Sequence, residues 1–431
     1  MTTEFNANPA AVILSGDESF ASHGSTQGSF MKLFRVVSAG AVVALSALAG
    51  VAPARAATIT DNYTFTRLAD TYGGHDIFLD ASINNAGQIV YRTNLDAGGS
   101  GVYRYSGGVT STVLQSGASQ PFSSVGPVTI NGSGAIAFTG TLASNGSRGV
   151  FRQSAGGAAI TPLYTAPANY SSFDRSHITD AGAGAVVFQA NTNAPVTYGV
   201  FRGDGSAAAT PVTGAGNVQV SANDIAASSG GTAVFLGTEQ VNGVLTLGVY
   251  TGDGSAPPAR VLDSTGPYEI FSNPAMSTNG TVLVSAGPDG GLSNPDAPAH
   301  LVRIAPGGAA EVIATTESLF DGFGIYAVNA AGNFATYSAL DTPSTYGVFA
   351  GPDPLRDKVL MTGDELFGET ITLARISKQG LNDHGQIVIR AQTPSGEEML
   401  VLATPVPEPA SAAALLTPAA AVMLRRRRRR R

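Results

Sequence analysis

The sequence contains no cysteine and no tryptophan. The absence of cysteine excludes disulfide bonds and thiolate metal sites, which are common staples of small secreted domains. Charged residues are also few, at 13% of 431 positions. Glycine, in contrast, occurs 53 times beside 24 prolines, within a chain that is 43% hydrophobic. Glycine without a collagen-like period, mixed with recurrent Val, Ile, Phe and Tyr, predicts many short β-strands joined by turns rather than disorder.

The formal net charge of −7 conceals an uneven distribution. Ten of the 24 basic residues lie in the two terminal segments, 1–56 and 425–431. Residues 57–424 carry 14 basic and 28 acidic side chains, a net charge of about −14. A body this acidic repels phosphate groups, so we expect no nucleic-acid partner.

The N-terminal region has the pattern of a secretion signal. Basic residues in Met31–Arg35 precede an apolar run, Val36–Val51, which has no polar face and so does not read as a buried amphipathic helix. The small-x-small pattern that signal peptidase accepts follows, and it predicts cleavage at Ala54, Ala56 and Ala57. We therefore interpret 1–56 as leader and signal peptide, with translation starting at Met31 or, alternatively, with a long leader.

The C-terminal segment, 405–431, has three parts in order. Pro407-Glu408-Pro409 comes first, and an Ala- and Leu-rich stretch, 412–424, comes second. The third part is a block of consecutive arginines: Arg425, Arg426, Arg427, Arg428, Arg429, Arg430 and Arg431. This arrangement resembles the PEP-CTERM sorting signal of Gram-negative bacteria.

That resemblance implies processing by an exosortase, a membrane sorting enzyme that cuts near the Pro-Glu-Pro motif. The arginines would act as a cytoplasmic stop that holds the hydrophobic helix transiently in the inner membrane until cleavage. The resemblance leaves open whether cleavage releases the protein or re-anchors it. Either outcome places it outside the cytoplasm, at the cell surface or in the extracellular space.

Between these ends, 57–404 is built from repeats. A glycine followed by a short apolar segment recurs at intervals of 47 to 53 residues, at Gly87, Gly134, Gly184, Gly231, Gly280, Gly332 and Gly385. Three residues earlier stands an Asn or Ser, with Ala181 as the exception. Asn and Gly both tolerate positive φ, so this spacing predicts a tight hairpin turn before each strand.

A second marker, Gly-Val-aromatic, follows 14 to 17 residues after most of these glycines. It occurs at Gly101, Gly149, Gly199, Gly248 and Gly347, and Leu-Val replaces it at Leu301 and Leu400. We expect the recurrent Gly and Asn to serve turn geometry and the recurrent Phe and Tyr to fill space between sheets.

Seven units of about 50 residues, each with room for four strands, predict an all-β fold, a seven-bladed β-propeller. The last repeat stops near Leu402, one strand short, and Tyr63–Ala69 could supply that strand and remove an open sheet edge. The predicted body is flanked by the N-terminal signal helix and the C-terminal hydrophobic helix. A β-solenoid and tandem sandwiches are the alternatives. The repeats also resemble tandem units of large exported bacterial proteins with interchangeable C-terminal anchors, and no activity follows from that resemblance.

The sequence offers no catalytic, cofactor-binding or metal-binding motif. Asp204 and Asp253 lie in Gly-Asp-Gly turns without a calcium-loop pattern. The body's histidines, His75, His177, His300 and His384, fall in different repeats, and we expect each to be a surface residue. There is neither a Gly-x-Ser-x-Gly elbow nor a phosphate-binding loop.

Three functions follow from this pattern. The sequence favours an exported, non-catalytic cell-surface or matrix protein, associated with extracellular polysaccharide or a surface protein. An enzyme acting on extracellular glycans or esters is the first alternative; it predicts clustered carboxylates, or a His–carboxylate pair, near the propeller axis. A protein–protein scaffold is the second, and it predicts an exposed aromatic patch.

Overall fold

The computed structural model describes residues 62–157, 159–182, 184–193, 197–213, 218–272, 274–288 and 298–406, with the backbone alone for 221–224. These residues form β-strands and turns, and no α-helix occurs among them. Accordingly, they include no helix long and apolar enough to span a bilayer. The signal helix predicted in 1–56 and the hydrophobic helix predicted in 412–424 both fall outside the described residues.

The strands form successive antiparallel sheets, each made of consecutive segments of the chain. The first consists of β2 (His75–Ile83), β3 (Ile89–Leu95), β4 (Ser100–Ser106) and β5 (Val109–Gln115). The second consists of β6 (Phe122–Ile130), β7 (Ile136–Leu142), β8 (Arg148–Gln153) and β9 (Ile160–Thr165). The third consists of β10 (Tyr170–Ile178), β11 (Val186–Thr192), β12 (Tyr198–Gly203) and β13 (Thr210–Pro211). The fourth consists of β14 (Gln219–Ala227), β15 (Ala233–Val241), β16 (Val244–Gly252) and β17 (Ala259–Asp263).

The remaining sheets continue the pattern. One contains β18 (Ile270–Phe271), β19 (Ala275–Met276), β20 (Val282–Gly287), β21 (His300–Ile304) and β22 (Ala310–Thr315). The next contains β23 (Phe320–Val328), β24 (Phe334–Leu340), β25 (Tyr346–Phe349) and β26 (Lys358–Met361), followed by a small hairpin of β27 (Glu365–Leu366) and β28 (Glu369–Thr370). The last contains β29 (Leu373–Leu381), β30 (Ile387–Gln392), β31 (Glu398–Pro405) and, from the other end of the body, β1 (Tyr63–Asp70).

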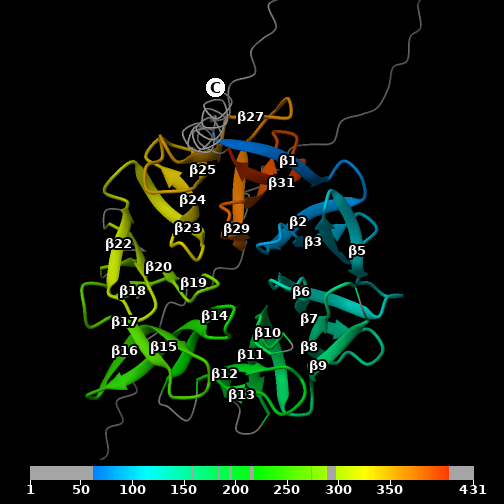
Figure 1. Cartoon of the computed structure of the whole chain (residues 1–431), viewed down its shortest axis with the longest axis vertical. Coiled ribbons are helices and arrows are strands. Elements are labelled where there is room, and N and C mark those ends of the chain that lie inside the picture. Colours follow the sequence, from blue (N-terminus) through cyan, green and yellow to red (C-terminus); the bar gives the residue numbers. More distant parts are fainter. Residues whose placement is uncertain are drawn as a thin grey trace, which may run out of the picture. The chain divides into compact units, whose positions relative to one another are not determined.

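The first and last sheets meet, and the arrangement is propeller-like. β2 and β29 touch through a single parallel pair, Ser82 with Gln379, which joins two four-stranded sheets. Figure 1 shows the sheets following one another around a common axis, with β2, β6, β10, β14, β23 and β29 innermost.

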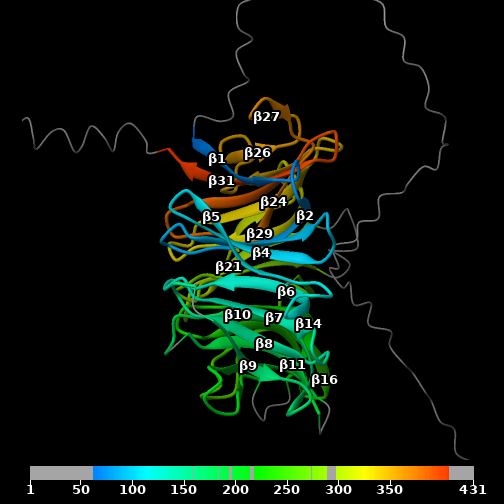
Figure 2. The same cartoon turned by 90° about the vertical axis from the view of Figure 1, so that its right-hand side faces the viewer.

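β1 completes the last sheet. It pairs antiparallel with β31 from Tyr63 opposite Pro405 to Asp70 opposite Met399, and the two strands lie side by side in Figures 1 and 2. The prediction that Tyr63–Ala69 supplies the missing strand is confirmed. The edge of β31 is thereby covered by the N-terminal end of the body.

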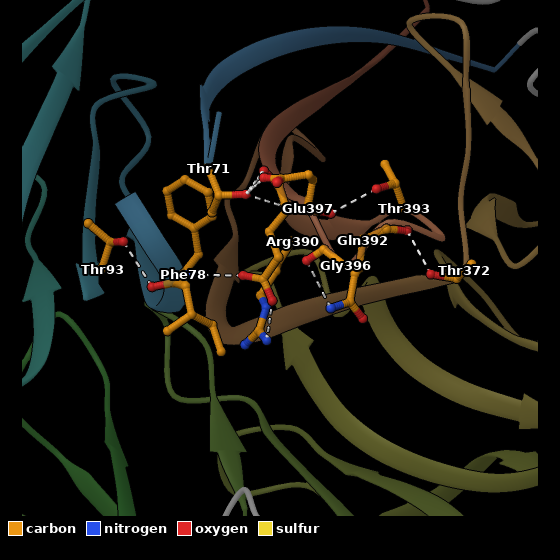
Figure 3. Close-up of polar contacts among 11 residues, drawn as sticks. Thr71, Phe78, Thr93, Thr372, Arg390, Gln392, Thr393, Gly396 and Glu397 are labelled. Carbon is orange, nitrogen blue, oxygen red and sulfur yellow. Dashed lines mark hydrogen bonds and ion pairs between the residues drawn. The ribbon is translucent and has the colours of Figure 1, made fainter. Parts of the chain in front are cut away.

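A buried carboxylate, that of Glu398, strengthens this closure; Figure 3 labels Thr71, Phe78, Arg390 and Glu397, the residues around it. Glu398, 2% exposed on β31, accepts a hydrogen bond from Phe78 N at 2.9 Å and forms an ion pair with Arg390 at 2.6 Å. Thr71, just after β1, accepts from Glu398 N and donates to Glu397. Because Phe78 lies on β2, one side chain links the last sheet to the first.

The hydrophobic core is divided among the sheet interfaces. Each buried cluster combines one face of a sheet with the opposing face of the next, as Val90, Val102 and Leu114 do with Phe138 and Phe151. The last sheet packs on the first in the same way, through Val388, Leu400 and Leu402 against Phe78 and Tyr91. Aromatic residues therefore fill space between sheets, as predicted.

The two sequence markers have distinct physical causes. The turn glycines, for example Gly134 at φ 85° and Gly280 at φ 91°, adopt the left-handed conformation that glycine tolerates best. The Gly-Val-aromatic marker forms a β-bulge. The pairing of its strand with the next strand changes register between Val150 and Phe151, and it does so at the equivalent positions of three other sheets. At Gly149 a β-carbon would lie 2.6 Å from the Tyr164 carbonyl oxygen, so glycine is needed for close approach.

Candidate functional site

The recurrent asparagines serve the turns and also join neighbouring sheets. Asn131 Oδ1 accepts hydrogen bonds from Ala135 N at 2.9 Å and the Ser133 hydroxyl at 2.8 Å, which holds its own turn. Its Nδ2 donates to Thr179 O in the next sheet at 2.9 Å. The sequence predicted the first role; the second was not predicted.

The same kind of asparagine hydrogen bond also joins the last repeat of the chain to the first. Asn382 Nδ2 donates to Asn84 O at 3.1 Å, and Asn84 Nδ2 donates to Asn131 O at 2.9 Å. All three asparagines are buried. Sequence separation is 298 residues for the first bond and 47 for the second, yet the geometry is the same.

Ala181 does not occupy the position that Asn or Ser takes in the other repeats. Thr179, not Ala181, occupies the asparagine position: its N–H donates to Ala185 O, as Asn131 N does to Ala135 O. The Thr179 hydroxyl accepts from Ala181 N at 3.3 Å. This turn is two residues longer than the others, so counting back from Gly184 missed it.

A recurrent arginine forms another connection between sheets that sequence reasoning missed. Arg104, Arg152 and Arg303 each donate to the carbonyl of the turn glycine in the following sheet, at 3.0, 3.0 and 2.8 Å. Arg202 does the same one residue earlier, at Gly230. The signal was available in sequence, because Arg104, Arg152 and Arg202 each follow a Gly-Val-aromatic marker directly.

The axis is crossed by side chains of a bulge in β29. Ile376 pairs with Ile389 and Leu381 with Ile387, so 377–380 bulge out opposite a single residue. From this bulge Gln379 Nε2 lies 2.7 Å from His177 Nδ1 on β10, and Lys378 Nζ lies 3.5 Å from Pro274 O. The bulge thus braces the last sheet against two sheets that are not its neighbours.

The four histidines of the body differ in environment. His384 is exposed, as predicted. His177 is half-buried near the axis rather than fully exposed, and burial lowers its pKa to about 4. His75 is half-buried against Tyr103, and burial lowers its pKa too. His300 Nδ1 lies 3.4 Å from the Tyr268 hydroxyl.

One contact at the axis bears on the enzyme hypothesis. That hypothesis predicted a carboxylate cluster or a His–carboxylate pair, whereas the partner of His177 is the amide of Gln379. In the described part of the chain, no three His, Asp or Glu side chains gather as metal ligands would. Asp204 and Asp253 each cap a turn by accepting from Ser206 and Ser255, and these hydrogen bonds lower the carboxyl pKa values.

A recess among the described residues lies between the β6–β9 and β10–β13 sheets. We call it the inter-sheet cleft; its volume is about 380 Å³, which is within the range of small-molecule sites. It opens where bulges in β6 and β10 separate the strands from their partners. Its polar lining consists of Ser124, Thr139, Thr141, Arg148, Asp174 and Arg175.

The local contacts explain why the cleft is polar and open. A β-carbon on Gly126 would lie 2.2 Å from Thr139 Oγ1, so only glycine fits beside that hydroxyl. Thr139 donates to Asp174 O at 3.2 Å and thereby ties the β10 bulge to β7. Ser124 donates to Thr141 at 3.0 Å. The cleft therefore presents fixed hydroxyls, one carboxylate and two guanidinium groups.

Such a set of groups can bind a polar ligand. Hydroxyl, carboxylate and guanidinium groups can exchange hydrogen bonds with a polyhydroxylated or anionic ligand. The sequence-predicted sorting and cleavage residues, Pro407 to Pro409, Arg425 to Arg431, and Ala54, Ala56 and Ala57, lie outside the described residues.

No family model and no curated protein matches the sequence. Among solved structures, an oligogalacturonate lyase from Vibrio parahaemolyticus is 11% identical with a TM-score of 0.48, over 80% of this chain and 98% of that one. An oligogalacturonate lyase in complex with manganese is 11% identical with a TM-score of 0.46, over 80% and 97%. TolB from Acinetobacter baumannii is 13% identical with a TM-score of 0.37 over 53% of this chain, which spans about half of TolB (52%). No activity is carried over from these similarities.

Proposed function

We propose that this chain is an exported, non-catalytic protein whose body binds extracellular polysaccharide at the cell surface or in the matrix. A PEP-CTERM-type tail at 405–431, processed by an exosortase after signal-peptide removal at Ala57, sorts it there. The observation that carries the proposal is the three-part order of the tail: motif, apolar run and arginine block. The polar inter-sheet cleft agrees with a sugar ligand, and the 14 basic side chains spread over residues 57–424 supply no run of cations for a nucleic-acid backbone.

The body in this proposal is a seven-bladed β-propeller. Supporting this blade count, seven turn glycines have positive φ, and seven hydrophobic clusters separate consecutive sheets. The N-terminal strand β1 belongs to the seventh blade. A closed ring of blades leaves loops and inter-blade clefts as the surfaces available to a ligand.

Retention on the exporting bacterium's own exopolysaccharide and on its cell envelopes tests the proposed function. The purified chain is applied to both immobilised materials, with an unrelated acidic protein of similar size as control. We expect retention beyond the control on at least one of them. Complete recovery in the flow-through from both would contradict the proposed function.

A protein–protein scaffold is the second candidate, and one local feature favours it. Phe367, at the tip of the β27–β28 hairpin, has φ 55° and is 45% exposed. The left-handed conformation costs a non-glycine residue roughly 1–2 kcal/mol. The Arg67 guanidinium lies 4.8 Å from its ring, a contact worth about 0.5–1 kcal/mol at an exposed site. Stability therefore does not explain this phenylalanine, whereas display to a partner does.

Exposed Tyr72 lies close by, since both Tyr72 and Arg67 contact Glu369. Cross-linking in intact cells from a photoreactive residue in place of exposed Tyr72, beside Phe367, tests the scaffold. A discrete cross-linked partner that Phe367→Asn abolishes would support it. Identical cross-linking by the variant, or no cross-linked protein, would remove this candidate.

A further inference from the structure

Two recesses share one arginine on the rim between the β6–β9 and β10–β13 sheets. Besides the inter-sheet cleft, a second recess of about 310 Å³ is lined by Asn145, Ser147, Arg148, Pro167 and Ser171, among others. Arg148, the first residue of β8, lines both. The two recesses therefore adjoin at Arg148 and form one surface, and Arg175 lines the first of them.

The Arg148 side chain is exposed and not engaged in the fold. Its backbone carbonyl accepts from Ala166 N, but its guanidinium makes no ion pair or hydrogen bond to the described residues. Arginines that serve the fold are bonded, as Arg92 is to Asp80 at 2.7 Å and Arg390 to Glu398 at 2.6 Å. The five donors of Arg148 are free to bind a ligand.

The chemistry of the surface selects the ligand class. A guanidinium binds carboxylate through two parallel hydrogen bonds, which an ammonium cannot do. The hydroxyls of Ser124 and Thr141 and the carboxylate of Asp174 can bond sugar hydroxyls. We infer that this surface binds a segment of acidic polysaccharide, with Arg148 holding a uronate carboxylate. The inference rests on the proposed function and names its site and ligand class.

The acidic body does not oppose this ligand at close range. At physiological ionic strength, charges more than about 8 Å from the bound polymer are largely screened. Two guanidinium groups, those of Arg148 and Arg175, line the surface itself beside the single carboxylate of Asp174. Two arginines and a carboxylate do not form the run of cations that a nucleic-acid backbone requires.

Affinity electrophoresis of the full chain, through gels containing alginate or dextran, tests the inference. Alginate is a polymer of uronates, and dextran is a neutral polysaccharide. We expect retardation by alginate, none by dextran, and at least tenfold weaker alginate binding for Arg148→Ala. The matched control is Arg356→Ala, an exposed arginine before β26, which changes net charge equally and should alter binding less than twofold.

The outcomes separate the two proposals. Alginate binding that Arg148→Ala leaves unchanged, or equal binding to dextran, would overturn this site and ligand class while the proposed function stands. Binding to the bacterium's own exopolysaccharide without binding to alginate would also overturn the ligand class while the proposed function stands. No retention on that exopolysaccharide or on the cell envelopes would overturn the proposed function itself. Arg148→Ala should not change the melting temperature, so loss of binding can be assigned to the contact.

Discussion

Gln379 on β29 donates across the axis to His177 on β10, with 2.7 Å between Nε2 and Nδ1. An amide nitrogen only donates, so His177 Nδ1 must be unprotonated and accept. Gln379 Oε1 is fixed in turn, because it accepts from the Ser82 hydroxyl at 3.0 Å. The contact therefore exists only with neutral His177, and it joins strands 202 residues apart in sequence.

This contact makes stability depend on pH in a defined direction. Burial holds the pKa of His177 at about 4 in the fold, against 6.5 for an unperturbed histidine. Below pH 6.5 the unfolded chain binds a proton that the folded chain does not, so stability falls and levels off near pH 4. The loss from this residue is about 3 kcal/mol at most.

Urea denaturation at pH 7, 5.5 and 4.5 measures this effect. We expect His177→Gln to flatten the fall in unfolding free energy between pH 6.5 and 4, and exposed His384→Gln to leave it unchanged. Equal slopes for wild type and His177→Gln would mean that His177 does not carry the effect.

Substitutions of Asn382 test the turn contacts that join the first and last repeats. Asn382→Ser should keep the turn, because Ser228 and Ser277 accept from Thr232 N and Thr281 N at the same position. It removes the bond to Asn84 O and should cost about 1 kcal/mol. Asn382→Ala also leaves turn N–H groups unpaired and should cost about 2–3 kcal/mol. Denaturation midpoints rank the variants; equal costs would show that the contact between repeats contributes nothing.

A substitution of Arg104 tests the hydrogen bonds that arginines donate to turn carbonyls of the following sheet. It donates to Gly134 O at 3.0 Å and to Gln153 at 3.3 Å, and burial lowers its pKa. Both bonds come from Nη2. Arg104→Lys keeps the charge but replaces a rigid, weakly hydrated guanidinium with a flexible, strongly hydrated ammonium, so we expect a loss of about 1–2 kcal/mol. Arg356→Lys is the surface control. A stability for Arg104→Lys equal to wild type would contradict a specific role for the guanidinium.

Glu398 tests the closure between the last sheet and the first. Glu398→Gln leaves Arg390 buried without its ion-pair partner, which typically costs about 3–5 kcal/mol. The neighbouring substitution Glu397→Gln should cost below 1 kcal/mol, because that side chain is partly exposed. Thermal melting of both variants gives the comparison, and similar melting temperatures would refute a special role for Glu398.

The repeat spacing predicted much of this fold, because each repeat forms the same turn and the same kind of sheet. The positive φ of Gly87 and Gly332 and the turn that Asn84 forms depend only on residues close in sequence. Such features recur at a fixed spacing, so the sequence reveals them. The Tyr63–Ala69 pairing followed from the missing strand of the last repeat. The arginine contacts were also periodic, but their acceptor is a carbonyl in the following sheet, which spacing does not reveal.

The axis and the cleft could not be predicted in this way. The bulge at 377–380 interrupts the repeat, and its partners His177 and Pro274 lie 202 and 104 residues from the side chains that contact them. The inter-sheet cleft forms where bulges in β6 and β10, on adjacent sheets, separate these strands from their partners. Histidine and arginine side chains there carried no local motif, and only the assembled sheets bring them together.

The termini of the protein recovered from its native cells test the proposed export most directly. Intact-mass and terminal-peptide mass spectrometry are applied to the envelope, medium and cytosolic fractions. We expect, outside the cytosol, a chain beginning at Ala57 and ending near Pro407-Glu408-Pro409, and an uncleaved membrane form when this motif is replaced by alanines. A soluble cytosolic chain that retains Arg425 to Arg431 would contradict it.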